Sequence, residues 1–415
     1  MDNGLRARAW RRVGPLFCAA AMVFLLRCVA HAAELEVSDF SFSGPLGCDG
    51  AKIEKLGTNH FKITLGHAPA HPDWPNKLYF TILRHAKGNS LRLDVVFEGG
   101  NAYIFNNYFY SWSYDGKNWR PIFWQKKSKD AAAGDTLIFP TFTEDTVYFG
   151  HQVPMSYEDM VELINEWRRS PYVRVHVVGQ SLEGRNLYRL EITDPQSPYP
   201  RSRRWVHYFA NQHPGEHNSQ WRMVGMINWL LSDEGADCRR RSICHFVLMM
   251  SPDGPSHGWY RVNAQGVDMN RSYRVEGADK NEQAHEAYLW QTDLEQIMAS
   301  DAPVTDIWAM HTWGGMVEPI CYPGPEMGTL VGPWTELRDI IERNDPKDLI
   351  EPLKARDKAS RNTMWTSGPR AQFGITAFLC EGAGAIYTKE ENMESGAILM
   401  KSLAEYYRGV KPKQQ

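Results

Sequence analysis

The character of the chain changes near Met155, and this change limits the possible folds more than any other feature. Before it, alternating or aromatic runs occur at 91–97, 103–112 and 145–149, with turn-forming residues between them and no long amphipathic helix. A run of short strands over about 115 residues is typical of a small sandwich of two sheets. We therefore expect an all-β sandwich domain over residues 33–152.

After this point the pattern alternates between helix and strand. Ser156 is expected to cap a helix that runs through Trp167, with Asp159 completing a capping box. Alternation of this kind predicts an α/β domain, with a mixed sheet and helices on both faces, over residues 153–411. The other expected elements are strands at 173–178, 187–192, 205–210, 246–250 and 307–310, and helices at 219–231, 282–298 and 395–407.

The first 32 residues have the pattern of an export signal. A basic start with Arg11 and Arg12 precedes an apolar run over 16–26, and Ala30-His31-Ala32 fits a small-x-small cleavage site. A membrane anchor is the alternative, but the run is shorter than the roughly 20 residues that a span needs. We expect a cleavable signal peptide over 1–32 and a periplasmic or secreted protein, with no membrane attachment after cleavage.

Charge and cysteine content narrow the class further. The chain carries 46 basic and 49 acidic residues, and the expected signal contains more arginine than acid, so no basic stripe remains that would indicate a nucleic acid partner. Five cysteines follow the signal, and their spacing fits no zinc knuckle. In an oxidising compartment some can pair, and Cys238 and Cys244 are the closest in sequence.

Two segments at the ends of strands offer metal ligands. His213 and Glu216 follow one expected strand and precede a helix, with Pro214-Gly215 as a tight turn between them, and His311 ends another strand. Ligands collect at such strand ends in open α/β sheets. Most isolated His-x-x-Glu pairs are surface accidents, but two imidazoles and one carboxylate together suit a catalytic zinc with an open position. We expect one Zn²⁺ per chain, bound by His213, Glu216 and His311.

The loop 254–277 offers groups that bind anions. Asn270 and Arg271 can grip a carboxylate, and Arg261 can polarise a carbonyl and stabilise an oxyanion. Asp268 is a candidate to orient a zinc histidine through its second ring nitrogen. The alternative for Asp268 and Arg271 is simple mutual neutralisation in a loop.

Glu381 follows the apolar segment 375–380 and precedes small residues. A carboxylate there can reach a metal-bound water and act as a general base. The alternative is a solvated glutamate at the end of a strand, which is common.

Together these segments resemble the zinc metallocarboxypeptidases, and most closely their cytosolic-carboxypeptidase-like branch. The similarity covers essentially all of the chain after the signal, loosely over 34–145. The resemblance implies that His213, Glu216 and His311 are the zinc ligands, Glu381 the general base and Arg261 the carbonyl-polarising arginine, while Asn270 and Arg271 grip the terminal carboxylate of a peptide or protein. The similar stretches are 148–157, 177–193 (VVGQSLEGRNLYRLEIT), 211–221 (NQHPGEHNSQW), 251–273 (SPDGPSHGWYRVNAQGVDMNRSY), 308–315 and 378–387.

Two departures from the family pattern stand out. Family members often carry a tyrosine upstream of the catalytic glutamate that closes over the substrate, yet here none lies between Tyr322 and Tyr387. That role is unfilled or taken by Trp365 or Phe373. The expected export also differs from the compartment after which the branch is named, so the natural substrate stays open.

These observations predict an exported zinc metallocarboxypeptidase that hydrolyses the C-terminal peptide bond. Arg370 is the only cation between about Met364 and Phe378, which indicates removal of acidic residues, with simple surface exposure as the alternative. Two other functions stay open. One is an exported amidase acting on cell-wall peptides, and the other is a non-catalytic binding module that retains the fold.

Overall fold

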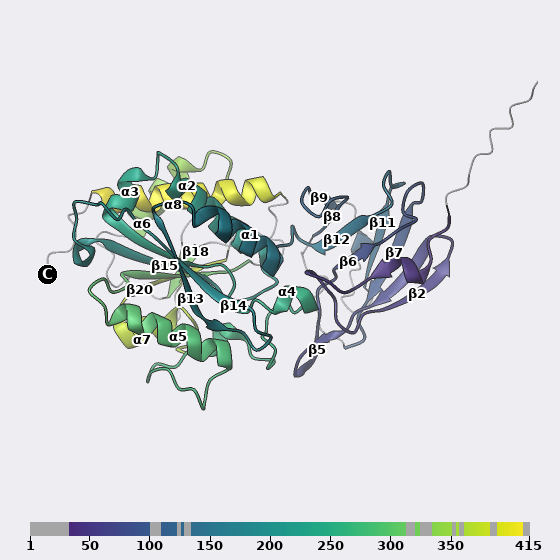
Figure 1. Cartoon of the computed structure of the whole chain (residues 1–415), viewed down its shortest axis with the longest axis horizontal. Coiled ribbons are helices and arrows are strands. Elements are labelled where there is room, and N and C mark those ends of the chain that lie inside the picture. Colours follow the sequence, from purple (N-terminus) through teal and green to yellow (C-terminus); the bar gives the residue numbers. More distant parts are fainter. Residues whose placement is uncertain are drawn as a thin grey trace, which may run out of the picture.

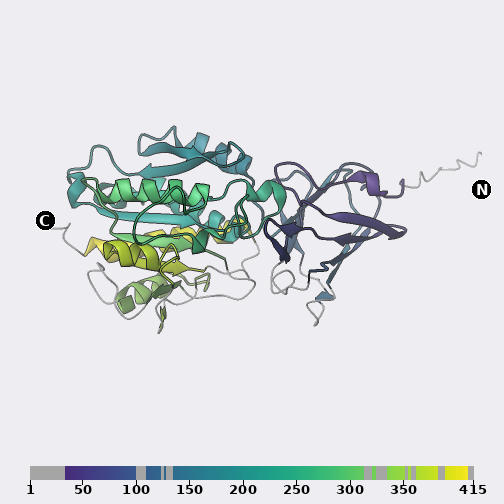
Figure 2. The same cartoon turned by 90° about the horizontal axis from the view of Figure 1, so that it is seen from below.

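A computed structural model of the protein shows two regions side by side along the long axis, a β-sandwich and an α/β region (Figures 1 and 2). Within the described residues, no helix has both the length and the apolar character that a membrane crossing requires. The expected signal lies outside these residues. The structure describes residues 33–99, 109–122, 126–127, 134–312, 320–323, 334–350, 354–356, 361–381 and 388–409.

The N-terminal region consists of two five-stranded sheets and a short two-stranded hairpin. The sheet orders are β1-β6-β12-β8-β9 and β10-β11-β7-β3-β2, and the hairpin pairs β4 with β5. A short 3-10 helix, Val37–Asp39, precedes β1. The strands are β1 (Phe40–Ser41), β2 (Lys52–Gly57), β3 (His60–Thr64), β4 (His67–Ala68), β5 (His71–Pro75), β6 (Phe80–Ile82), β7 (Leu91–Val96), β8 (Tyr110–Ser113), β9 (Arg120–Ile122), β10 (Lys126–Lys127), β11 (Asp135–Phe139) and β12 (Val147–His151).

One apolar core holds the two sheets together. Alternate residues of β7, such as Leu91 and Leu93, are buried, while Arg92 between them is exposed. This alternation is the expected signature of a strand with one face on a core. Phe80 and Phe149 come from the other sheet and stack with their ring centroids 4.7 Å apart. The expected β-sandwich is confirmed.

The second region is built around one eight-stranded mixed sheet, in the order β13-β14-β16-β15-β17-β20-β18-β19. The four neighbours β16, β15, β17 and β20 run parallel. Their carboxyl ends therefore meet at one edge of the sheet, where ligands bind in open α/β folds. The strands are β13 (Val173–Gln180), β14 (Asn186–Ile192), β15 (Trp205–Asn211), β16 (Ser242–Val247), β17 (Asp306–Met310), β18 (Ile320–Pro323), β19 (Lys354–Arg356) and β20 (Thr376–Cys380).

Helices cover both faces of this sheet, as expected for the predicted α/β class. Figure 1 shows α2 and α8 on one side and α5 and α7 on the other. Two separate apolar clusters match this arrangement, one centred on α2 and α8 and the other on α5. The helices are α1 (Tyr157–Trp167), α2 (His217–Leu231), α3 (Ala236–Arg241), α4 (Gly254–His257), α5 (His285–Met298), α6 (Trp334–Asn344), α7 (Ser367–Phe373) and α8 (Lys389–Arg408), with 3-10 turns at Arg201–Arg203 and Met269–Arg271.

The helix expected after Ser156 is present with its capping box. The Ser156 hydroxyl accepts a hydrogen bond from the Asp159 backbone N–H at 3.0 Å, and the Asp159 carboxylate accepts one from the Ser156 N–H at 2.9 Å. Each bond satisfies a donor that the first turn of a helix leaves open. The helix thus begins at Tyr157 for a reason contained in the local sequence.

Some expected elements are displaced. The strand expected at 246–250 lies at Ser242–Val247, because α3 ends at Arg241 and the chain enters the sheet at once. Residues 248–250 are buried beyond its end, so their apolar character reflects burial and not strand pairing.

Cys238 and Cys244, the closest candidates for a disulfide in the sequence, are free buried thiols in contact with each other. The exact domain boundary at 152 stays a prediction.

Backbone hydrogen bonds join the two regions at α4, which Figure 1 shows beside the sandwich. The N–H groups of Gly47, Asp49 and Lys77 donate to carbonyls of 255, 257 and 258 at 3.0, 3.0 and 2.7 Å. A Cβ at Gly47 would lie 2.0 Å from the carbonyl oxygen of Ser256, so only glycine permits this approach. The sandwich is therefore fixed against the loop that contains the candidate site residues.

Candidate active site

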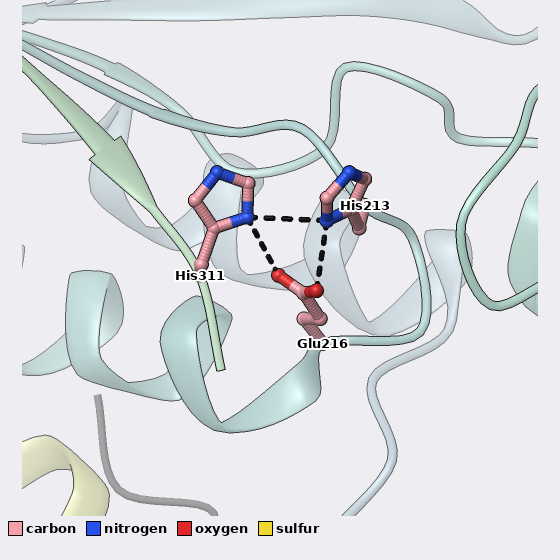
Figure 3. A group of neighbouring side chains, drawn as sticks. All are labelled: His213, Glu216 and His311. Atoms are coloured by element: carbon pink, nitrogen blue, oxygen red, sulfur yellow. Dashed lines mark hydrogen bonds and ion pairs between the residues drawn. The ribbon is translucent and has the colours of Figure 1, made fainter. Parts of the chain in front are cut away.

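Three predicted metal ligands meet at the carboxyl edge of the sheet (Figure 3). His213 and Glu216 lie in the turn between β15 and α2, and His311 directly follows the neighbouring strand β17. The turn is tight because Gly215 lies against Tyr260: its N–H donates to the Tyr260 carbonyl at 3.0 Å, and a Cβ there would come within 2.8 Å of the Tyr260 Cα. A glycine at this position brings the His and Glu side chains together.

The three side chains present their ligand atoms to one point. His213 Nδ1 lies 2.7 Å from Glu216 Oε1, His311 Nδ1 lies 2.8 Å from Glu216 Oε2, and the two Nδ1 atoms are 3.1 Å apart. All three side chains are buried, with exposed fractions of 2 to 3%. Within the described residues they form the one group of three or more His, Cys, Asp or Glu side chains with this geometry.

This donor set fits zinc. Zinc takes nitrogen and oxygen ligands at about 2.0–2.1 Å, so two atoms in a tetrahedral shell lie roughly 3.3 Å apart. The observed separations of 2.7, 2.8 and 3.1 Å are somewhat shorter, so the three ligand atoms would move apart slightly to hold the ion. Three protein ligands leave the fourth position for water or substrate, which is the arrangement of catalytic zinc sites.

Two residues of the loop 254–277 contact the ring nitrogens of His213 and His311 that face away from the ligand atoms. Asp268 Oδ1 lies 3.0 Å from His213 Nε2, and its other oxygen accepts a hydrogen bond from Arg261 Nε at 2.7 Å. Asn270 Nδ2 lies 3.1 Å from His311 Nε2. The Trp365 backbone N–H donates to Asn270 Oδ1 at 3.0 Å and so sets the orientation of the amide. A carboxylate that accepts from the second ring nitrogen, as Asp268 does for His213, orients the ligand ring and tunes the affinity for the metal.

Glu216 has partners that the sequence did not single out. The Tyr260 hydroxyl donates to Oε1 at 3.2 Å, and the Thr312 backbone N–H donates to Oε2 at 3.1 Å. Tyr260 is 8% exposed and directly precedes Arg261 in the motif. That position beside a motif arginine is the only sequence signal that could have identified it.

The electrostatics favour a charged carboxylate among the ligands. Burial opposes ionisation of Glu216, but His213 and His311 outweigh it and lower its pKa. Burial also raises the pKa of Asp268, while His213 and then Arg261 lower it, with a net decrease. Both groups are therefore anionic at neutral pH, as a metal ligand and the partner of a ligand must be.

Two residues of the sandwich reach this site, and neither was predicted. Lys77 is 2% exposed, and its Nζ lies 4.5 Å from the centroid of the Tyr260 ring, within the range of a cation–π contact. The Tyr79 hydroxyl lies 2.5 Å from Nε2 of His217, the residue after Glu216. Both lie just before β6, in a segment that reads only as part of a β-rich domain.

The structure joins the other predicted residues to this edge less directly. Glu381 follows β20, which pairs with β17 so that Met310 opposes Cys380, and the His311 N–H donates to the Cys380 carbonyl at 2.8 Å. Glu381 therefore lies beside His311 at the ends of these two strands, and it is half-buried. Arg271 is exposed and donates to the Asn270 carbonyl at 2.7 Å, and Arg370 is half-buried on α7.

Trp365, one candidate to replace the missing tyrosine, belongs to the core. It is 1% exposed, and its ring packs edge-on against Tyr273 with centroids 5.3 Å apart. A side chain this buried is unsuited to closing over a substrate. Phe373, the other candidate, is partly buried against the cluster that includes α5.

The fold is that of solved metallocarboxypeptidases. The structure superposes on a metallo-carboxypeptidase from Burkholderia cenocepacia with a TM-score of 0.71 at 18% identity, covering 89% of this chain and 98% of that one. A Pseudomonas aeruginosa metallo-carboxypeptidase, solved with (2-guanidinoethylmercapto)succinic acid, gives a TM-score of 0.67 at 19% identity, covering 86% and 96%. At these identities the likeness concerns the fold.

Sequence comparison finds a matching family and curated relatives. Residues 160–309 match the zinc carboxypeptidase family Peptidase_M14. Cytosolic carboxypeptidase 2 of Danio rerio is 37% identical over 147 residues, which are 34% of this chain and 20% of that protein. The same protein of Xenopus tropicalis is 27% identical over 250 residues, or 54% and 26%. The matches thus span about a fifth to a quarter of these relatives. Residues 160–309, about a third of the chain, are thus similar to the zinc carboxypeptidase family, and the matched part is homologous to cytosolic carboxypeptidases.

Proposed function

We propose that this protein is a zinc-dependent carboxypeptidase that hydrolyses the C-terminal peptide bond of peptides or proteins. The observation that supports this most directly is the convergence of His213 Nδ1, His311 Nδ1 and the Glu216 carboxylate, with Asp268 and its partner Arg261 behind. A zinc ion bound there supplies Lewis-acid activation of water and of a carbonyl.

The other residues divide the remaining tasks. Glu381, beside His311 at the strand ends, accepts a proton from the attacking water and returns it to the leaving amine. Arg261 stabilises negative charge on the carbonyl oxygen. The Asp268 carboxylate accepts a hydrogen bond from the Arg261 guanidinium. Burial lowers the pKa of Arg261, but Asp268 and then Glu216 raise it by more, so the side chain stays cationic.

Exopeptidase action follows from anion recognition beside the metal. Asn270 and Arg271 are adjacent in the 3-10 turn Met269–Arg271, and Asn270 contacts His311, so a terminal carboxylate bound here places the last peptide bond near the ligands. Arginine and amide donors match a carboxylate well. Arg370 on α7 is the proposed source of a preference for acidic terminal residues.

Digestion of a peptide library, read by mass spectrometry, tests the reaction. We expect loss of single C-terminal residues, no cleavage of C-terminally amidated peptides, and loss of activity with a chelator that zinc restores. Glu381→Gln should lower the rate by at least about 100-fold, as for loss of a general base, while zinc content is unchanged. Internal cleavage, or release of cell-wall peptides in preference to linear ones, would contradict the proposal.

A second assay addresses the side-chain preference. Arg370→Ala should lower kcat/KM for peptides ending in Glu relative to peptides ending in Leu, by about tenfold for the loss of one charged contact. Arg361→Ala, an exposed arginine nine positions earlier on the chain, is the control. An unchanged ratio would show that Arg370 does not select the substrate.

We further propose that the protein is exported after removal of residues 1–32. The support is the basic, apolar and small-residue order at the start of the sequence. N-terminal sequencing of the protein recovered outside the cytoplasm should give Ala33 as the first residue. Recovery of the intact N-terminus in the cytoplasmic fraction would contradict this.

A further inference from the structure

A cavity of about 630 Å³ lies at the edge of the α/β sheet opposite the candidate active site. Arg204 lines it and directly precedes β15, whereas His213 follows the other end of that strand. At about 3.3 Å per residue, the two positions are roughly 30 Å apart along the strand. The cavity is therefore distinct from the peptidase site, and its volume is in the range of small-molecule sites.

The charge of its lining is strongly one-sided. Four arginines line it, Arg168, Arg174, Arg201 and Arg204, against one acidic residue, Glu191. The protein as a whole has a formal charge of −3, so this concentration of arginine is a local feature and not a general property of the surface. A polar concave site with convergent cations is suited to an anion.

Glu191 does not neutralise the other three arginines, because it already forms an ion pair with Arg201. The guanidinium of Arg201 donates to both carboxylate oxygens, Nη1 to Oε1 at 2.9 Å and Nη2 to Oε2 at 3.3 Å. This bidentate pair is the geometry in which arginine and a carboxylate bind best. Three positive charges remain in the lining.

Arg204 is the least exposed of these charges, at 6%. Its three hydrogen bonds all go to neutral oxygens: Nε to the Tyr199 carbonyl at 2.9 Å, and Nη1 to Thr193 Oγ1 at 2.8 Å and to the Asp194 carbonyl at 3.0 Å. Among the described residues it has no carboxylate within ion-pair distance, and Nη2 makes no hydrogen bond. Of the described carboxylates, only the more distant ones of Asp194 and Glu191 attract this charge. A buried charge without a direct ion pair is costly, which favours an anion from solution as its partner.

Arg168 and Arg174 complete the site at the rim. Both are exposed, and within the described part of the chain neither forms an ion pair. They carry charge that can move toward a ligand, whereas Arg204 is already held in place by its three hydrogen bonds. One fixed guanidinium and two mobile ones suit an anion with several charged oxygens better than a single carboxylate.

We propose that this cavity binds a multivalent phosphate-type oxyanion, with Arg204 at its base and Arg168 and Arg174 at its rim. Two sources have this chemistry: a free polyphosphate and the phosphate headgroup of an anionic lipid. The site gives the protein a second binding function that operates independently of peptide hydrolysis.

Calorimetric titration with inorganic pyrophosphate at low ionic strength tests the proposal on the full protein. We expect one site per chain and an affinity that falls with added salt. The double variant Arg168→Ser/Arg174→Ser should weaken binding by about tenfold or more, equivalent to about 1.4 kcal/mol. The control is Arg169→Ser/Arg203→Ser, which removes the same charge from two exposed arginines that do not line the cavity.

Flotation with vesicles that contain phosphatidylglycerol separates the two sources. If the wild type binds the vesicles and only the Arg168→Ser/Arg174→Ser variant loses this binding, the ligand is a lipid headgroup. If the wild type binds pyrophosphate but not the vesicles, the ligand is a free phosphate. Peptide cleavage and the melting temperature should be equal in both double variants, because none of the four arginines lies near the peptidase site. Equal anion binding by the two variants, or no binding of either probe by the wild type, would overturn the proposal.

Discussion

The hydroxyl of Tyr79, in the β-sandwich, lies 2.5 Å from Nε2 of His217, the residue that follows the candidate zinc ligand Glu216. The other ring nitrogen of His217 accepts a hydrogen bond from the Met155 backbone N–H at 3.2 Å. His217 is completely buried, and burial lowers its pKa to about 4, so the ring is neutral at physiological pH. The sandwich is thus part of the support of the candidate metal site.

Replacing Tyr79 by Phe should loosen that support. The substitution leaves a buried ring nitrogen without its partner, which costs about 1–3 kcal/mol of unfolding free energy. We also expect a lower affinity for zinc, because α2 begins at His217 and Glu216 precedes it. Unfolding in denaturant and zinc competition with a chromophoric chelator measure the two effects. The control is Tyr148→Phe, at a half-buried residue of β12 in the same sandwich, and equal values for both variants would refute this role.

Asp268→Asn should weaken zinc binding without unfolding the protein. Asp268 contacts both His213 Nε2 and Arg261 Nε, so the amide keeps the shape but removes the charge that orients the ring. Loss of such a partner commonly costs 10- to 100-fold in metal affinity. The matched control is Asp279→Asn, in the following loop and away from the ligands. A zinc affinity equal to that of the wild type would show that Asp268 does not orient His213.

Lys77 predicts a pH dependence of stability. Burial lowers its pKa to about 7 from an ordinary 10.5, although Glu216 and Asp135 oppose the shift. Between these values the unfolded chain holds a proton that the folded chain lacks, so this residue makes the unfolding free energy rise with pH through that window. Below about pH 7 the buried amine is charged in the folded protein. The full cost of charging it then lowers the unfolding free energy, by about 1.4 kcal/mol per unit by which the pKa is shifted.

Lys77→Met should remove this contribution. We expect the variant to melt at a higher temperature than the wild type near pH 6 and the difference to shrink toward pH 10. Scanning calorimetry across this range measures the effect, with Lys52→Met on exposed β2 as the control. A difference in melting temperature that is constant across the pH range would show that Lys77 is not the titrating group.

Two glycines set the contact between α2 and α8. A Cβ on Gly225 would lie 1.8 Å from the Met393 carbonyl oxygen, and one on Gly396 would lie 1.8 Å from the Arg222 carbonyl oxygen. Because backbone atoms on both helices would have to separate, Gly225→Ala and Gly396→Ala should each lower stability by about 1–3 kcal/mol or more. Gly409→Ala has no heavy atom within 4 Å of its Cβ and should change little, as measured by denaturant unfolding.

The sequence predicted the elements whose signals are local. Ser156 and Asp159 form the capping box that starts α1, and alternation identified β7 before any pairing was known. His213 and Glu216 were identifiable because they lie three residues apart around a Pro-Gly turn. Helix α7 was not expected, because the segment Ser367–Phe373 contains Gly and Pro and has little helical periodicity.

What only the tertiary structure decided is which distant residues meet. His311 reaches His213 because β15 and β17 are parallel neighbours, a pairing that joins positions 98 residues apart. Lys77 and Tyr79 could not be predicted for the same reason. A lysine and a tyrosine before a strand indicate no function in the sequence, and their role depends on the other region that packs against them. Local preferences depend on neighbours in the chain, so the sequence alone determined helix starts, strand alternation and the set of candidate metal ligands. Contacts across the sheet and between the two regions depend on packing, and they decide both the outer support of the candidate metal site and the arginine-lined cavity at the opposite edge of the sheet.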